Sequence, residues 1–501
     1  MITLSHLTYS YPGQPPVLND LSLSFENGVH TALMGPNGSG KSTLALLVKG
    51  LILPTGGQVI VDGLSASSGE SERLEVMKRV GLVFQSPDNT IVATTVEREL
   101  AFGLENLGIP GAEMRLRVDE ALFLFDLEEY RHANPSHLSG GEKQRLALAA
   151  VMIMRPSHLI LDEPTSLLDP GSRERILGLI SDQARCGATV IHITQFALEA
   201  LHADRAVVLL PPHSYFVQAG TPEESGICRD GAPSDVLRDT AGLGIRGIEP
   251  TGALFAKPLA AQIQKKNESA GQIIRLENVS YWYDRGLPFE KKALDAIDLT
   301  LFRGTSTVLL GPAGSGKTTL LEIAAGITAP DAGHVQVQGN PIRAMAFQFP
   351  EDQMFGDTVG EYVAFGPENV GIPKAEIART VEEALRAVGL DPPLYRDRDP
   401  LALSGGEKRL AALAGVLAMR PEVLILDEPT AGLDLRGTAL VAGFLKEYLA
   451  GGGTLLFSTH DFEAAGSLAE YALVLDHGRI ETYGEIEDVF AKSTWLGKVK
   501  K

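Results

Sequence analysis

The stretch 35-GPNGSGKST-43 decides the fold of this chain, and it returns in the second half as 311-GPAGSGKTT-319. An apolar run, VHTALM, leads into the first copy, and STVLL leads into the second. A strand that enters a glycine-rich loop ending in Lys and Ser or Thr, followed by a helix, is the arrangement of a phosphate-binding loop. The glycines let the backbone curl so that its N–H groups point at phosphate oxygens. The sequence therefore predicts two phosphate sites, each with a helix that begins at Lys41 or Lys317.

Residue types in the loops suit distinct chemical roles. Lys41 and Lys317 are expected to neutralise the β- and γ-phosphates of a nucleotide. The hydroxyls of Ser42 and Thr318 suit a magnesium ion that bridges those phosphates. The loop residues that we expect to bind nucleotide are Gly35, Pro36, Asn37, Gly38, Ser39, Gly40, Lys41, Ser42 and Thr43 in the first copy, and Gly311, Pro312, Ala313, Gly314, Ser315, Gly316, Lys317, Thr318 and Thr319 in the second.

A second repeated motif supplies carboxylates downstream of each loop. It reads LILDEPTS from Leu159 and LILDEPTA from Leu424. The apolar run predicts a strand whose carboxyl end places an aspartate, Asp162 or Asp427, near the metal. The glutamates that follow them, Glu163 and Glu428, are suited to orient and deprotonate an attacking water. An acidic pair after a strand is otherwise typical of a helix cap, but the surrounding motifs in both halves favour catalysis.

The repeat also defines the domain organisation. The motif LSGGEK precedes each acidic pair, and the spacing from its serine to the aspartate is identical in the two halves. Short apolar runs alternate with helical segments, which predicts two α/β domains with mainly parallel sheets flanked by helices. We expect a first domain at 1–235, an exposed linker at 236–270 that mixes Gly, Pro, Ala and polar residues, and a second domain at 271–501.

The two halves differ in one spacing. The segment between Lys41 and Gln85 is longer than the segment between Lys317 and Gln348. The difference predicts that the second half lacks a counterpart of the polar segment LSASSGESERLEVMKR, at 64–79. We expect this segment to be an excursion on the surface of the first domain.

With these motifs, and LSGGE above all, the chain resembles the ATP-binding cassette family over nearly all of both halves. The resemblance implies two doubly wound phosphate-loop cassettes with helical signature subdomains, which hydrolyse ATP with Mg²⁺. It also implies that the cassettes pack head to tail as an intramolecular dimer. The signature residues Ser139, Gly140 and Gly141 would then close over the nucleotide on Lys317, and Ser404, Gly405 and Gly406 over the nucleotide on Lys41.

Further site residues follow from the same resemblance. Gln85 and Gln348 match the family's glutamine that contacts magnesium and senses a transmembrane partner. Tyr11 and Tyr283 match a ring that stacks on adenine, although an aromatic residue on an early strand fits core packing about equally well. The implied metal ligands are Ser42, Gln85, Asp162, Thr318, Gln348 and Asp427.

One position separates the two predicted sites. His460 follows Glu428 at the spacing of the family's switch histidine, which contacts the γ-phosphate, whereas Gln195 stands at the same spacing after Glu163. Glutamine donates a hydrogen bond but cannot become cationic, so stabilisation of the charged transition state should weaken. A register shift that puts His192 in this place is disfavoured, because side chains three apart on a strand point to opposite faces. We predict ATP binding at both sites and faster hydrolysis in the second half.

Composition limits the classes of function. The formal net charge of −19 disfavours nucleic acid as the main partner, because its phosphates require a clustered basic face. Two cysteines are too few for a disulfide framework and fit a reducing cytosol. The N-terminus does not read as a secretory signal, and no apolar run approaches the roughly 18 residues that span a bilayer. We expect a peripheral protein that a partner holds at the cytoplasmic face of the cell membrane.

The segments after the two glutamines indicate a subfamily. They read SPDNTIVATTVERELAFGLENLGIP from Ser86 and FPEDQMFGDTVGEYVAFGPENVGIP from Phe349. Both are similar to the ATPases of energy-coupling-factor (ECF) importers of vitamins or transition-metal ions. That resemblance implies two partners, an integral membrane coupling protein and a small membrane protein that captures the substrate. The alternatives are a fused sugar-importer ATPase, whose altered cassette is generally the second one, and a soluble cassette ATPase acting on ribosomes or DNA.

Overall fold

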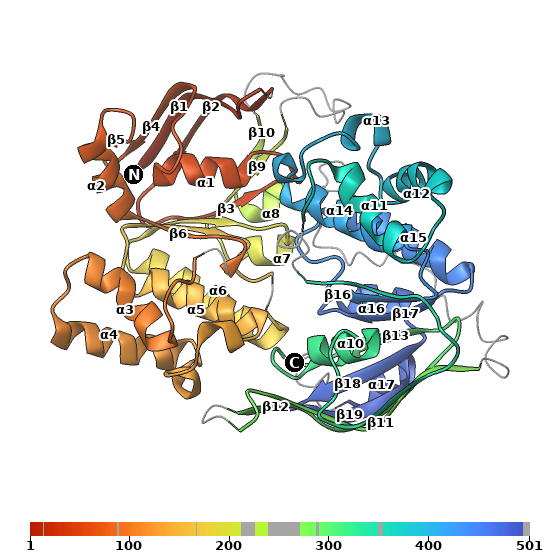
Figure 1. Ribbon diagram of the computed structural model, residues 1–501. Coiled ribbons are helices and arrows are strands. Elements are labelled where there is room, and N and C mark those ends of the chain that lie inside the picture. The colour runs from red at the N-terminus through yellow and green to blue at the C-terminus, as the bar shows by residue number, and fades with distance from the viewer. Residues whose placement is uncertain are drawn as a thin grey trace. The chain divides into compact units, whose positions relative to one another are not determined.

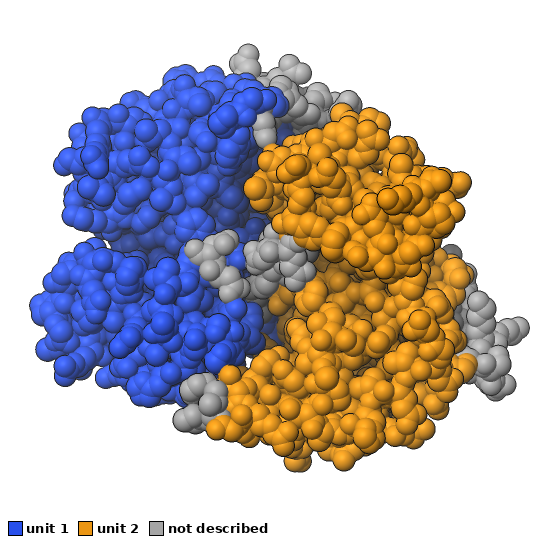
Figure 2. All heavy atoms as spheres, in the orientation of Figure 1, with its two compact units in different colours: residues 1–249 blue, residues 250–501 orange. Residues whose placement is uncertain are grey.

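The computed structural model describes residues 1–13, 15–87, 90–166, 168–211, 226–238, 271–286, 290–348 and 354–493. The chain divides into two compact units, residues 1–249 (unit 1) and 250–501 (unit 2), which are blue and orange in Figure 2. The predicted linker at 236–270 lies outside the described residues from position 239 onward.

Unit 1 is built on two sheets (Figure 1). The antiparallel sheet has the order β2-β1-β4-β5, and the described strands of the central sheet have the order β10-β9-β3-β8-β7-β6. All neighbours in the central sheet are parallel except β10, which runs antiparallel to β9. The strands are β1 (Ile2–Ser10), β2 (Pro16–Phe25), β3 (His30–Met34), β4 (Gly56–Val61), β5 (Leu64–Ser65), β6 (Val80–Val83), β7 (His158–Asp162), β8 (Thr189–Ile193), β9 (Arg205–Leu209) and β10 (Ile227–Gly231).

Helices cover both faces of the central sheet in unit 1. They are α1 (Lys41–Lys49), α2 (Glu70–Arg79), α3 (Val96–Asn106), α4 (Gly111–Leu124), α5 (Gly140–Met152), α6 (Pro170–Arg185), α7 (Ala197–Ala200) and α8 (Pro233–Val236). Leu44 and Leu47 of α1 are buried in one core with Leu4 of the antiparallel sheet and Ile191 of the central sheet. Each such leucine contributes about 1.5–3 kcal/mol on burial. Helix α1 is therefore fixed between the two sheets.

Unit 2 repeats this plan with a smaller antiparallel sheet. Its described strands have the orders β12-β11-β14 and β15-β16-β17-β13-β18-β19. The strands are β11 (Gln272–Tyr283), β12 (Lys291–Phe302), β13 (Ser306–Leu310), β14 (Ala332–Val337), β15 (Arg343–Ala346), β16 (Val423–Asp427), β17 (Thr454–Ser458), β18 (Tyr471–Asp476) and β19 (Arg479–Glu485). The helices are α10 (Lys317–Ala325), α11 (Val359–Asn369), α12 (Lys374–Ala387), α13 (Pro392–Tyr395), α14 (Gly405–Ala418), α15 (Leu435–Ala450), α16 (Phe462–Leu468) and α17 (Ile486–Lys492).

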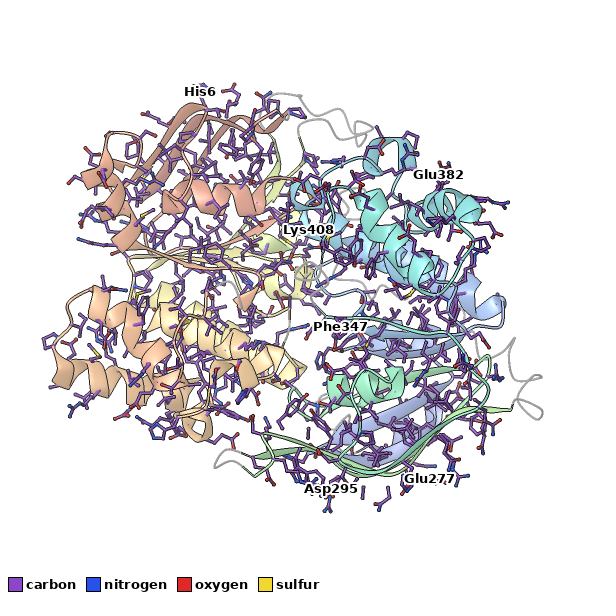
Figure 3. The ribbon with its side chains drawn as sticks, viewed as in Figure 1. His6, Glu277, Asp295, Phe347, Glu382 and Lys408 are labelled. Atoms are coloured by element: carbon purple, nitrogen blue, oxygen red, sulfur yellow. The ribbon has the colours of Figure 1, made fainter. Side chains whose placement is uncertain are left out.

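Within unit 2, the antiparallel sheet and the helical part lie at opposite ends. Figure 3 shows Glu277 and Asp295 on the sheet and Glu382 and Lys408 on the helices α12 and α14. Phe347, which directly precedes the predicted glutamine of this unit, lies between them. The α/β prediction is therefore confirmed for both halves.

The topology brings the predicted motifs to one edge of each central sheet. In unit 1, β3 pairs in parallel with β8, and β8 with β7. The carboxyl ends of parallel neighbours lie at the same edge, where ligands bind in folds of this class. The phosphate loop follows β3, Gln195 follows β8, and Glu163 follows β7. Unit 2 repeats this order with β13, β17 and β16.

The predicted excursion of unit 1 forms regular structure. Its residues form β5 and α2, and the Arg73 side chain of α2 donates to the carbonyls of Gly50 and Leu51 at the end of α1. In unit 2, the described residues between β14 and β15 contain no helix or strand. Arg343 instead donates to the Ala324 carbonyl at the end of α10, at 3.0 Å. An arginine thus binds backbone carbonyls at the C-terminal end of this helix in both units.

Candidate functional site

The phosphate loop of unit 1 has a closely packed backbone. Gly35 has a φ of 144°, and a Cβ there would lie 2.1 Å from the Leu209 carbonyl oxygen. The Lys41 side chain is buried, and its Nζ donates to the carbonyls of Gly35 at 2.7 Å and Pro36 at 2.9 Å. The lysine is therefore held over its own loop, at the start of α1, where N–H groups and the helix dipole favour an anion.

Unit 2 repeats this loop closely. Gly311 also has a φ of 144°, and a Cβ there would lie 2.1 Å from the carbonyl oxygen of Leu475. Lys317 Nζ donates to the carbonyls of Gly311 and Pro312, at 2.9 Å each. Both loops thus form the glycine cradle that a phosphate chain requires.

Oxygen donors suited to magnesium lie beside each loop. In unit 2, the Thr318 hydroxyl donates to Asp427 at 2.6 Å. In unit 1, burial and then the neighbouring Glu163 raise the pKa of Asp162 to about 6, although a hydrogen bond from Ser42 and the charge of Lys41 oppose the shift. A hydroxyl and a carboxylate are hard oxygen ligands that fit Mg²⁺. Magnesium bound there would neutralise phosphate charge and favour ionised aspartates.

The glutamate of unit 1 is enclosed by side-chain amides. Gln195 Nε2 donates to Glu163 Oε1 at 2.8 Å, and Gln85 Nε2 donates to Glu163 Oε2 at 3.1 Å. Gln195 Nε2 also donates to Asn37 Oδ1 of the phosphate loop, at 2.8 Å. Both oxygens of Glu163 therefore already accept a hydrogen bond from a side-chain amide, so an attacking water would have to compete with Gln195 or Gln85 for this carboxylate.

The glutamate of unit 2 has a different environment. Among the described residues, no hydrogen-bond donor reaches Glu428 Oε1. His460 Nε2 lies 3.5 Å from that oxygen, and the His460 backbone N–H donates to Oε2 at 3.3 Å. Burial is the main cause that raises the pKa of Glu428 to about 7, and Lys317 opposes the shift. A carboxylate with a pKa near neutrality is well matched to the task of a general base.

This pKa predicts a pH dependence of the ATP hydrolysis that the motifs indicate. A general base acts in its deprotonated form, so the rate should rise with pH and level off above the pKa of about 7. At about pH 6 the rate should be about tenfold below the plateau, because the ionised fraction falls tenfold for each unit below the pKa. The measurement is the maximal rate at saturating ATP between about pH 5.5 and pH 9. A flat profile across neutrality would contradict this assignment of the base.

Both glutamates occupy an uncommon backbone conformation. Glu163 has a φ of 48° and Glu428 a φ of 50°, the left-handed region that residues with a side chain seldom adopt. The Glu163 N–H donates to the Ile193 carbonyl at 3.0 Å, and the Glu428 N–H donates to the Ser458 hydroxyl at 3.0 Å. Strain retained at the same position in two units is typical of a functional site.

The predicted adenine-stacking tyrosines lie beside the loops. The hydroxyls of Tyr11 and Thr43 share a hydrogen bond of 3.2 Å, and those of Tyr283 and Thr319 share one of 2.9 Å. The Tyr283 side chain is 37% exposed, so a planar ligand could reach its ring. The histidine considered as a substitute in unit 1, His192, is fully buried. Its ring stacks on His30, and burial lowers its pKa to about 3.

The signature residues lie in the helical part of each unit. Ser139 caps α5 and Ser404 caps α14, and each forms a capping box with the glutamate three residues later. The helix N-termini that begin at Gly140 and Gly405 favour an anion. Among the described residues, Ser139 and Ser404 form hydrogen bonds with Glu142 and Glu407 of their own helices, and none of these bonds joins a signature serine to the phosphate loop of its own unit.

Two side-chain contacts at the sites were not predicted from the sequence. Asn37 was predicted as a loop residue, but not as the partner of Gln195; its counterpart in unit 2 is Ala313. Arg409 replaces Gln144 in the second half and donates to the Gln348 carbonyl at 2.8 Å. Both contacts join segments far apart in sequence, and only the difference between the repeats at these positions could have indicated them.

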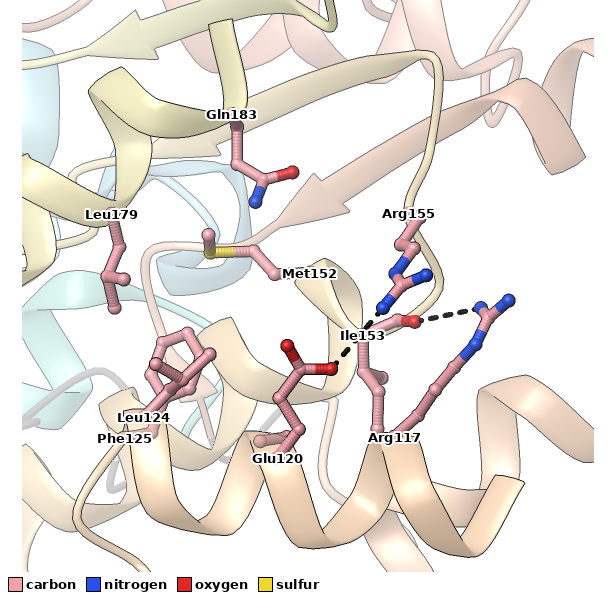
Figure 4. Close-up of a pocket in the computed structure, with 10 residues that line it drawn as sticks. Arg117, Glu120, Leu124, Phe125, Met152, Ile153, Arg155, Leu179 and Gln183 are labelled. Atoms are coloured by element: carbon pink, nitrogen blue, oxygen red, sulfur yellow. Dashed lines mark hydrogen bonds and ion pairs between the residues drawn. The ribbon is translucent and has the colours of Figure 1, made fainter. Parts of the chain in front are cut away.

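A pocket in the helical part of unit 1 is separate from this site (Figure 4). Apolar side chains including Phe125 and Met152 line it. At its rim, Arg155 pairs with Glu120 at 3.3 Å, and Arg117 donates to the Ile153 carbonyl at 3.3 Å. None of its lining residues belongs to the phosphate loop or the acidic pair.

One family model matches both halves of the chain, and relatives with similar sequences align with more than nine tenths of it. The family model described as "ABC transporter" matches residues 18–166 and 294–431. A Bifidobacterium longum protein named as a "Putative ABC transporter ATP-binding protein" is 34% identical, over 93% of this chain and 64% of its own length. A Caldanaerobacter subterraneus protein with the same description is 33% identical, over 99% of this chain and 93% of its own. The Bacillus subtilis "Putative HMP/thiamine import ATP-binding protein YkoD" is 32% identical, also over 99% and 93%.

Solved structures share the tandem fold. The structure titled "RNase-L Inhibitor" aligns with a TM-score of 0.60 at 19% identity, over 99% of this chain and 93% of that one. A chain from "Model of ribosome-bound archaeal Pelota and ABCE1" aligns with a TM-score of 0.66 at 20% identity, over 96% and 78%. At these identities, the likeness concerns the fold alone.

Proposed function

The chain belongs to the ABC transporter family of ATP-binding proteins, whose cassettes bind ATP with Mg²⁺ and hydrolyse it, and from this premise we propose that it energises an ECF-type membrane importer. The cargo class is a vitamin or a transition-metal ion. Its partners in this proposal are an integral membrane coupling protein and a small membrane protein that captures the substrate. Within the part of the chain that the structure describes, no helix has the length and apolar character to cross a bilayer.

The observation that carries this proposal is an apolar surface present in both units. Three positions around α3 and α11 expose large apolar side chains, and these positions are equivalent in the repeat. We call them the apolar trio of each unit: Val92, Phe102 and Leu107 in unit 1, which are 65%, 48% and 37% exposed, and Phe355, Phe365 and Val370 in unit 2, which are 47%, 52% and 37% exposed. Exposed apolar side chains that recur at equivalent positions indicate a pair of docking surfaces.

The position of the trio agrees with a coupling role. Each trio lies in the segment that follows the predicted glutamine, Gln85 or Gln348. The Gln85 side chain donates to Glu163, the candidate base of unit 1, at 3.1 Å. The segment that carries the trio of unit 1 therefore begins at a residue bound to that carboxylate. A partner seated on the trio could therefore respond to nucleotide at the loop. The name of the Bacillus subtilis relative, which refers to HMP/thiamine import, supports the importer class.

The proposal includes a role for each set of site residues. Two ATP molecules bind on Lys41 and Lys317, and the signature that begins at Ser139 completes the second site while the one that begins at Ser404 completes the first. Glu428 takes the proton of the attacking water, and His460 stabilises charge at the γ-phosphate. Closure on ATP and reopening after hydrolysis are passed to the membrane partner through the two trios.

The test is purification of the tagged chain from its native membranes, followed by identification of the bound proteins by mass spectrometry. We expect one multi-spanning coupling protein and one small hydrophobic protein. Replacing Phe102 and Phe365 with Asp should lower their recovery at least about tenfold, because each ring loses about 1.5–3 kcal/mol of burial. The ATPase rate of the detached chain should not change, since neither ring lies in the site.

The matched control replaces Leu394 and Leu401 with Asp, two apolar residues that are 66% and 75% exposed outside the trios. These changes should leave the recovery of the membrane proteins unaltered. Recovery of ribosomes, DNA-repair proteins or sugar permeases instead would reject the importer and favour one of the alternative classes.

A further inference from the structure

A buried carboxylate lies close to the segment that follows β8 in unit 1 and carries Gln195, which we call the switch segment. Glu199 on α7 is four residues after Gln195, and 2% of its surface is exposed. Its Oε1 accepts a hydrogen bond from the Thr165 hydroxyl, and its Oε2 accepts one from the Thr194 hydroxyl, each at 2.5 Å. Arg173 Nε lies 3.5 Å from Oε1. A buried carboxylate is stable only when it is hydrogen-bonded and paired, and Glu199 meets both conditions.

These contacts join the two segments that carry the candidate catalytic side chains. Thr165 is two residues after Glu163, and Thr194 directly precedes Gln195. The Thr194 hydroxyl oxygen also accepts from the Phe196 N–H at 3.1 Å, and Arg173 lies over the Phe196 ring at 4.9 Å. Both sides of Gln195 are therefore fastened to the same carboxylate, directly or through the arginine.

Unit 2 connects the corresponding segments in another way. At the positions of Glu199 and Arg173 it has Ala464 and Thr438. There the Ser458 hydroxyl donates to Asp427 and accepts from the Glu428 N–H. The residue that corresponds to Ser458 in unit 1 is Ile193, which has no hydroxyl. A buried side chain outside the predicted site therefore ties the end of the acidic strand to the segment at the end of the next strand in each unit, Glu199 in unit 1 and Ser458 in unit 2.

We propose that Glu199 is a positioning residue of the unit 1 site: by holding Thr165 and Thr194, it keeps the Gln195 amide against Glu163 and Asn37. The inference rests on the assignment of Glu163 and Gln195 to an ATP site and does not depend on the membrane partner. Phosphate binding depends mainly on the loop and Lys41, which Glu199 does not contact. Loss of Glu199 should therefore lower the rate of the chemical step and leave ATP affinity nearly unchanged.

The experiment isolates unit 1 by using the full chain with Glu428→Gln, in which hydrolysis at unit 2 is suppressed. Steady-state ATP hydrolysis is followed as a function of ATP concentration, with and without Glu199→Ala, which matches the residue type at position 464. We expect the saturating rate to fall about tenfold, while the half-saturating ATP concentration stays within about twofold. Glu199→Gln should recover part of the rate, because its amide oxygen can still accept from a threonine.

A double-mutant cycle checks the route through Thr194. Thr194→Val should lower the rate by a similar factor, and its combination with Glu199→Ala should lower it little further. If Glu199→Ala does not fold, Glu199→Gln and Thr194→Val carry the test alone.

Four outcomes would overturn the proposal. They are an unchanged saturating rate with only a lower unfolding temperature, equal losses of rate and of ATP affinity, full additivity in the cycle, and no hydrolysis at unit 1 for Glu199 to support. Failure to recover membrane proteins in the purification described above would reject the importer and leave this inference unaffected.

Discussion

Replacing Glu428 with Gln is expected to remove most of the ATP turnover, whereas replacing Glu163 with Gln should leave a substantial fraction. Glu428 faces His460 at 3.5 Å and has a pKa raised to about 7, so it can take a proton near neutral pH. Glu163 already accepts a hydrogen bond from a side-chain amide on each oxygen. We expect the Glu428 variant to lose about 10²- to 10³-fold at its own site, the usual cost of removing one group that stabilises a transition state.

The measurement is steady-state phosphate release by the purified chain at saturating ATP. The two substitutions remove the same carboxylate at equivalent positions, so each serves as the control for the other. Binding of ATP to both sites should persist in both variants, because Lys41 and Lys317 are unchanged. Equal losses of turnover would contradict the predicted asymmetry.

The second large effect should cross from one unit to the other. In the proposed head-to-tail arrangement, the signature of unit 1 completes the ATP site of unit 2. Ser139→Arg should then suppress the fast hydrolysis that depends on Glu428, by about 10²-fold or more, because in that arrangement a bulky cation would replace the group proposed to contact the transferring phosphate. Ser404→Arg should affect mainly the slower site of unit 1 and leave most of the turnover.

The two serines form a well-matched pair for this comparison. Each caps a helix and forms the same capping box. Losing either cap should cost about 1 kcal/mol of stability, so the unfolding temperatures of the two variants should fall by similar amounts. A larger loss of turnover for Ser404→Arg than for Ser139→Arg would contradict the proposed pairing.

The parts of the site that repeat could be predicted from the sequence. The phosphate loops, the acidic pairs and the switch positions are local motifs with fixed chemistry, and parallel strands require their carboxyl ends to meet at one edge. The close packing of Gly35 against the Leu209 carbonyl, which leaves no room for a Cβ, and the 2.6 Å contact between Thr318 and Asp427 both lie within those motifs.

The parts that depend on side-chain contacts between distant segments could not be predicted in the same way. The hydrogen bonds of Glu199 require Thr165 and Thr194, which lie in segments far apart in the chain. In the sequence, an acidic residue on a short helix looks like an ordinary surface residue. The sequence predicts a surface excursion at 64–79, and its residues are exposed or half-buried apart from Ala66 and Val76, but the pattern does not indicate that Arg73 of α2 binds the end of α1. Val76 is the one buried residue of α2, and the polar residues around it give no periodic pattern that would indicate its burial.

Because both units lie on one chain, every molecule contains one unit of each kind. The pair Asn37 and Gln195 occurs in one unit, and the pair Ala313 and His460 occurs in the other. If separate polypeptides carried these units and associated at random, about half of the dimers would contain two units of the same kind. In the fused chain, the ratio of the two kinds is one to one in each molecule, whatever the level of expression. Each unit can therefore accumulate substitutions suited to its own site without ever being paired with a copy of itself inside the molecule.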